Sequence, residues 1–183
     1  MRFYASLLSI ATCFLAGCNQ QGPVDYGFSI NNVDVNRAYQ SLDVRLQQDL
    51  KLSAQAREAL EHGVTLTLAL EMELRNDNNM IVAKKDSNRY QLSYLPLSER
   101  YQLEAEKTGG MKTYPRLRHL LAAIDDVSIP ISTGPLPPGS YELRVRVRLD
   151  ESSLPAPMQL PAWLSSQWRH DSEWSVWPFE ISA

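Results

Sequence analysis

The chain has 183 residues, of which 44% are hydrophobic, and its 18 basic and 21 acidic residues give a formal net charge of -3 at pH 7. A chain of this length can bury the core of one domain. The acidic balance argues against a general nucleic-acid binder, which would need a basic face.

The N-terminal segment has the features of an export signal. Arg2 supplies a positive charge, and residues 3–16 form a mostly apolar run that is shorter than the about 20 residues needed to span a bilayer. The run ends in Leu-Ala-Gly-Cys at 15–18, which resembles the bacterial lipobox, where the cysteine thiol is acylated before cleavage. This pattern predicts a signal peptide over 1–17 and a lipidated Cys18. The alternative is ordinary secretory cleavage that leaves this cysteine unmodified.

Two further expectations depend on Cys18. In the lipoproteins that this segment resembles, an aspartate after the cysteine favours retention in the inner membrane. The next residue here is Asn19, so we expect the outer membrane rather than the inner one, with the protein facing the periplasm. Because Cys13 lies in the predicted leader and is the only other cysteine, no disulfide is expected in the processed chain.

The rest of the chain has the pattern of antiparallel sheet. Residues 18–27 carry two glycines and a proline without an apolar period, and predict a tether. Beyond it, apolar and polar residues alternate at 42–52, 64–74 and 141–149, which predicts strands with one buried and one exposed face. In this pattern Leu68 and Val145 are buried, whereas Thr67 is exposed. Weaker strands are expected at 28–35, 80–85, 89–95, 100–106, 126–132 and 174–181.

Two short helices are expected between these strands. The first begins after Ser53, a suitable N-cap, and ends at Gly63. The second runs from Pro115 to about Ile124, where apolar residues recur with the spacing i, i+3, i+4, i+7. Many amphipathic strands separated by turn sequences predict one mainly β domain over 28–183. We expect an antiparallel β-sandwich, of which the immunoglobulin-like arrangement is one form, with an open barrel as the alternative.

The sequence also resembles a known family. Three passages are similar to the bacterial family named domain of unknown function 4390: "AREALEHGVTLTLALEMELR", "YQLSYLPLSERYQL" and "YELRVRVRLDESSLPAPMQLPAWLSSQWRHDSEWSVWPF". The last passage is the most specific, because leucine-proline after the RLD strand and spaced tryptophans recur in the family. Residues 75–86 depart from the family, where an aromatic-rich segment is expected. The resemblance implies a shared fold and export, and it implies no activity.

Catalytic and metal chemistry have little support in the sequence. The histidines His62, His119 and His170 do not form the close pairs of zinc sites, so no metal and no cofactor is predicted. Residues 170–173, His-Asp-Ser-Glu, include the residue types of a catalytic triad. Triads are assembled by spatial geometry rather than by adjacency, so a turn is the preferred interpretation. We therefore expect that the protein is not an enzyme.

A cluster of aromatic residues near the C-terminus is the first candidate binding surface. Tryptophans can bind sugars or partner proteins, but packing against the core is the favoured interpretation. The tryptophan cluster consists of Trp163, Trp168, Trp174 and Trp177.

The second candidate is the arginine ladder, formed by Arg144, Arg146 and Arg148 on one face of a predicted strand. Three guanidinium groups on one face can meet lipid phosphates or an acidic partner. The favoured interpretation is neutralisation within the chain by opposite charges on neighbouring strands. The candidate carboxylates are Glu71, Glu73, Glu104 and Glu106.

These observations predict a non-catalytic binding or scaffolding module of the cell envelope, held to a membrane through Cys18. The expected partner is an envelope protein, without nucleic acid or metal. One alternative is a regulatory partner of a membrane sensor kinase, which the family resemblance implies because relatives are often encoded near one. The other is an envelope hydrolase, which would need distant polar residues gathered in one cleft.

Overall fold

The computed structural model describes residues 26–38, 40–106 and 109–182; the predicted signal peptide, Cys18 and most of the predicted tether lie outside these ranges. The strands are β1 (Gly27–Arg37), β2 (Ser41–Lys51), β3 (Leu66–Asn76), β4 (Ile81–Leu95), β5 (Arg100–Ala105), β6 (Gly110–Tyr114), β7 (Asp126–Ser132), β8 (Gly139–Leu149) and β9 (Ser175–Ile181). The helices are α1 (Ala54–Glu61), α2 (Leu117–Asp125) and α3 (Ala156–Leu164), with 3-10 turns η1 (Glu151–Ser153) and η2 (Ser166–Trp168).

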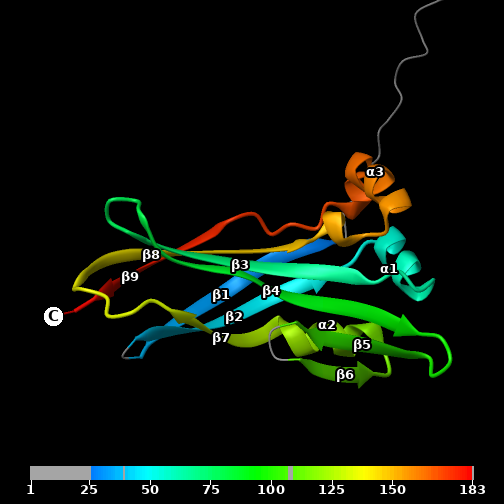
Figure 1. Cartoon of the computed structure of the whole chain (residues 1–183), viewed down its shortest axis with the longest axis horizontal. Coiled ribbons are helices and arrows are strands. Elements are labelled where there is room, and N and C mark those ends of the chain that lie inside the picture. Colours follow the sequence, from blue (N-terminus) through cyan, green and yellow to red (C-terminus); the bar gives the residue numbers. More distant parts are fainter. Residues whose placement is uncertain (1–25, 39, 107–108, 183) are drawn as a thin grey trace, which may run out of the picture.

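The strands form two antiparallel sheets that lie against each other in an elongated body (Figure 1). The smaller sheet has the order β1-β2-β7, and the larger one has the order β6-β5-β4-β3-β8-β9. Every strand pair is antiparallel. The prediction of a mainly β, antiparallel sandwich is therefore confirmed, and the sheets do not close into a barrel.

Alternating apolar side chains fill the space between the sheets. In the smaller sheet, β2 buries Leu42, Val44 and Leu46 while the residues between them are exposed. In the larger sheet, Leu68 of β3 and Val145 of β8 belong to the same core, as their positions in the alternating runs predict. Removal of this apolar surface from water is the main favourable contribution to folding.

The exposed face predicted for the first half of β3 is wrong. Thr67 is only 5% exposed and Ala69 is fully buried, so this part of β3 is covered on both faces. The chain that follows β8 supplies the cover: η1 packs against β3, and the backbone N–H of Asp150 donates to the Thr67 carbonyl at 2.8 Å. The alternation within one strand does not predict that a segment distant in the sequence covers the strand's outer face.

The two expected helices are present, although α2 begins at Leu117 rather than at Pro115. The Oγ of Ser53 accepts a hydrogen bond from the backbone N–H of Ala56 at 3.1 Å, which satisfies one free donor at the start of α1. Gly63, just beyond the helix, has φ +89°, a left-handed conformation that suits glycine. In α2, Leu120 and Ile124 lie on the buried stripe that the spacing predicts.

Three elements differ from the expected ones. The residues predicted as two strands form the single strand β4, whose pairing with β3 shifts register between Leu70 and Met72. β6 is not among the expected strands. It is short and mostly exposed, and its sequence therefore shows no alternation of apolar and polar residues. α3 is not among the expected helices, because Pro161 inside the helix is a poor helix former, whereas Pro157 lies in the first turn, where proline is tolerated.

We predict that Val145→Asp unfolds the domain. The substitution loses the burial of a valine, worth about 1.5–3 kcal/mol, and adds the larger cost of an unpaired buried charge, against a total stability of about 5–15 kcal/mol. The matched control is Ser132→Asp at an exposed position of β7. Thermal melts followed by circular dichroism should show a large loss for Val145→Asp only, and equal melts would contradict the register of β8.

Candidate functional site

A cleft lies beside the end of β8, where the chain enters the segment that carries α3. It has a volume of about 640 Å³. We call it the β8 cleft. It is lined by Arg146, Arg148, Leu149, Asp150, Glu151, Ser152, Gln159, Trp163, Arg169, His170 and Asp171. Two residues of the arginine ladder and one residue of the tryptophan cluster, predicted separately from the sequence, therefore meet at one site.

Arg146 is neutralised from within the chain by Asp171. Its guanidinium group bonds both carboxylate oxygens, with Nε donating to Oδ1 at 2.8 Å. Burial alone would raise the pKa of Asp171, but the hydrogen bonds from Arg146 and from the Glu173 backbone N–H lower it below its ordinary value of 3.8. The guanidinium carbon also lies 5.9 Å from the centre of the Trp174 ring. This bidentate pair forms one wall of the β8 cleft.

Arg148 lies between two carboxylates. Its Nε donates to Glu71 on β3 at 3.1 Å, which is one of the cross-strand pairings that the sequence predicts. Its Nη1 lies 3.6 Å from Asp150. The third member of the ladder, Arg144, is 3.6 Å from Glu142 on its own strand.

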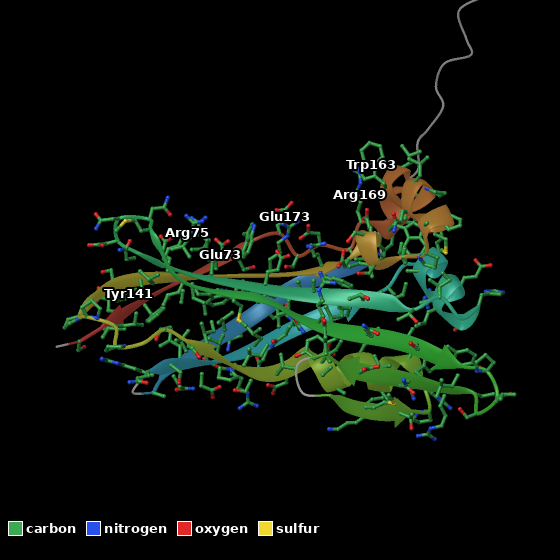
Figure 2. The ribbon with its side chains drawn as sticks, viewed as in Figure 1. Glu73, Arg75, Tyr141, Trp163, Arg169 and Glu173 are labelled. Atoms are coloured by element: carbon green, nitrogen blue, oxygen red, sulfur yellow. The ribbon has the colours of Figure 1, made fainter. Side chains whose placement is uncertain are left out.

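Two of the other expected partners, Glu104 and Glu106, lie away from the ladder. Glu73 lies opposite Arg144 in the register of β3 and β8, and it also accepts a hydrogen bond from Arg75 at 2.9 Å (Figure 2). Glu104 lies on β5, which β4 and β3 separate from β8, and Glu106 lies 4.0 Å from Arg89. Alternation places these carboxylates on exposed faces, but it does not show which strands are neighbours.

Asp150 is a buried charge with a complete set of partners. Its carboxylate accepts hydrogen bonds from the hydroxyls of Ser152 at 2.6 Å and Ser153 at 2.9 Å, and it lies 3.1 Å from Nη1 of Arg89. Burial alone would raise its pKa, but these hydrogen bonds and the nearby arginines lower it. Asp150 therefore stays ionised and fixes the turn that leaves β8.

His170 connects three segments at the base of the β8 cleft. It is 1% exposed, and its Nε2 accepts a hydrogen bond from the Ser53 backbone N–H at 2.9 Å. The ring centre lies 5.4 Å from that of Tyr26 and 5.2 Å from that of Phe28. Burial lowers the pKa of His170 because it disfavours the charged ring. The polar sequence around this histidine carries no signal of its burial.

The His-Asp-Ser-Glu run does not assemble a nucleophile and a base. His170 faces Ser53 and Asp171 faces Arg146, as described above. Ser172 Oγ donates to the Glu173 carbonyl and accepts from the Val147 backbone N–H. Within the residues that the structure describes, no group of three or more His, Cys, Asp and Glu side chains is placed to hold a metal ion.

The four tryptophans separate into different environments. Trp168 is buried in the core, Trp177 is half-buried on β9, and Trp174 is partly exposed beside Arg146. Trp163 projects from α3 and is 67% exposed; Figure 2 shows it with Arg169 at the same end of the molecule. Some members of the tryptophan cluster therefore pack against the core, whereas Trp163 and Trp174 remain accessible.

A second cleft, of about 490 Å³, lies at the far end of the larger sheet. Its walls come from the turn between β3 and β4, the start of β8 and the end of β9. Tyr141 stacks on Phe179 there, with ring centres 5.8 Å apart, and donates its hydroxyl to the Pro137 carbonyl at 2.9 Å. Arg144 of the arginine ladder lines this end cleft and not the β8 cleft.

Fold and site together define a two-sheet antiparallel β domain with a polar cleft at one end. The chain belongs to the family described as Domain of unknown function (DUF4390), whose sequence model matches residues 25–178. No curated protein and no solved structure matches the chain. None of the helices among the described residues is long and apolar enough to cross a membrane.

We predict a measurable coupling between Arg146 and Asp171. Because the pair is bidentate and about two-thirds buried, Arg146→Gln and Asp171→Asn should each cost about 1 kcal/mol, and the double variant should cost little more than either single one. The free energies of unfolding should be measured in urea. Since the folded-state pKa of Asp171 is lowered, the coupling should be complete above pH 3.8 and should be lost as the pH falls through the folded-state value. Additive losses at pH 7 would contradict the pairing.

Proposed function

We propose that the chain is a lipid-anchored, periplasm-facing module of the bacterial envelope that binds a protein partner without catalysing a reaction. The observation that carries the proposal is the composition of the β8 cleft. Trp163 and Arg169 lie exposed at its rim, whereas the arginines on its wall already have carboxylate partners. Tryptophan and arginine are the residue types that contribute most to binding energy at protein interfaces.

The polar groups inside the β8 cleft support recognition rather than catalysis. The hydroxyl of Ser152 donates to Asp150, whose lowered pKa makes this carboxylate a weak base. The accepting nitrogen of His170 is occupied by the Ser53 backbone N–H. A nucleophile needs a base within hydrogen-bond reach, and these side chains are engaged in contacts that hold the cleft together.

The anchor in this proposal is Cys18. The support is the Leu-Ala-Gly-Cys sequence at 15–18 after an apolar run, and Asn19 favours the outer membrane over the inner one. A cysteine that carries more than one acyl chain would hold the domain stably at the membrane, because one chain alone binds only marginally.

We predict that Cys18→Ser releases the protein from the membrane fraction of cells. The variant cannot form the thioether that carries the acyl chains, so the cleaved domain should appear in the periplasmic fraction, and a membrane-bound variant with the wild-type N-terminal mass would contradict the prediction. The measurement is fractionation together with the N-terminal mass of the wild-type chain. A wild-type N-terminus without acyl chains, or wild-type protein found only in the soluble periplasm, would contradict the anchor.

We predict that a photoreactive amino acid at Gln159, inside the β8 cleft, forms a discrete protein adduct in intact cells. Arg169→Ala should abolish the adduct, because it removes an exposed charge from the rim without disturbing the core. The matched control is Arg100→Ala, an exposed arginine at the β4-β5 turn, which should leave the adduct unchanged.

The identity of the adduct distinguishes the proposed functions. A membrane sensor kinase would favour the regulatory alternative, and another envelope protein would favour a scaffolding role. An adduct that both arginine variants retain equally would contradict the β8 cleft as the binding site.

A further inference from the structure

α3 carries an apolar face that the domain does not cover. Pro157, Leu160, Pro161 and Leu164 follow the spacing i, i+3, i+4, i+7 and are all exposed, with Leu160 at 64% and Leu164 at 66%. The opposite side of the helix, at Ala162, packs into the core. We call these four residues the α3 face.

The side chains of α3 suit a partner that is recognised by apolar contact rather than by charge. The helix contains no charged residue, and its single amide side chain, Gln159, is held by the carbonyls of Ser152 and Leu154. Trp163 lies at the edge of the α3 face, between it and the β8 cleft. Scattered apolar residues are normal on a protein surface, but a contiguous group on one helix indicates a docking surface.

The start of β1 lies at the same end of the domain as the α3 face. The rings of Tyr26 and Phe28 contact His170, which lies two residues after the end of η2, and η2 packs against α3. The chain therefore enters the domain at the end where α3 lies. Seven residues lie between Cys18 and Tyr26, and the eight steps from one residue to the other span at most about 29 Å.

We propose that the α3 face lies in the surface of the bilayer that carries the anchor, with Leu160 and Leu164 among the acyl chains and Trp163 at the level of the head groups. This inference rests on the proposed lipidation of Cys18. A short anchor keeps α3 at a high local concentration next to the bilayer, so even a small apolar face binds there. Tryptophan prefers this interface, and short apolar helix faces insert to this depth.

The test uses the processed chain, lipidated at Cys18, in phosphatidylcholine vesicles that contain brominated lipids, which quench tryptophan fluorescence by contact. We expect quenching in the wild type and its loss in Trp163→Phe, because the other tryptophans are packed or partly covered. The double variant Leu160→Asp, Leu164→Asp should also lose the quenching.

The matched control is Met80→Asp with Ile81→Asp. These residues are also exposed and apolar, but they lie at the turn between β3 and β4, at the opposite end of the molecule (Figure 1). The control variant should keep the full quenching. Circular dichroism melts should show that both double variants remain folded, because all four residues are exposed.

The outcomes separate this inference from the anchor itself. An unmodified N-terminus would contradict the anchor, and the α3 face is then tested on chains coupled through the Cys18 thiol to a maleimide lipid in the same vesicles. Lipidated protein whose tryptophans are not quenched would overturn the inference while the anchor stands. Loss of the Gln159 adduct in the Leu160 and Leu164 variant, without any lipid quenching, would identify the α3 face as a protein-binding surface instead.

Discussion

The two-residue period of β8 is the constraint on which both the core and the cleft depend. Leu143, Val145 and Val147 enter the space between the sheets, so the arginines between them must lie on the outer face. β8 is paired on both edges, with β3 on one side and β9 on the other, and a one-residue slip would move its own apolar side chains to the outer face. The three positive charges are therefore fixed in place, and carboxylates on β8 itself and on neighbouring segments neutralise them.

The segment between β8 and β9 supplies part of this neutralisation. It leaves β8 at the buried carboxylate of Asp150 and returns at His170, whose carbonyl accepts from the Leu149 backbone N–H at 2.8 Å. Directly after it, Asp171 reaches Arg146, which completes the neutralisation of the outer face. Because both ends of the segment are held by buried polar contacts, α3 itself does not need to be buried. This explains how a short helix with two prolines can keep an apolar face exposed.

The sequence predicts those features whose signal is local. The strands follow from alternation, and the first helix follows from Ser53 as its cap and Gly63 as its stop, because each signal lies within a few residues of the element it defines. The partners of the arginines could not be predicted in the same way: Glu71 is one of four equivalent carboxylates until the strand order is known, and Asp171 lies in a run that indicates only a turn. The burial of His170 and Thr67 depends on the segment after β8, which has no period of its own. The sequence therefore predicts some of the residues that line the β8 cleft, but it does not predict that they lie together.

The elongated shape gives the two clefts different surroundings. Figure 2 shows Trp163 near one end of the molecule and Tyr141 near the other, and the chain enters at the Trp163 end, where Tyr26 contacts His170. With an anchor at Cys18 and α3 on the bilayer, the β8 cleft opens beside the membrane surface and the end cleft points away from it. A partner of the β8 cleft would then be a segment that lies close to the bilayer, such as the periplasmic part of a membrane protein next to its membrane span. On that proposal, a freely diffusing periplasmic protein would have easier access to the end cleft, so the distance from the proposed anchor, more than the chemistry of either cleft, would separate the partners that each can bind.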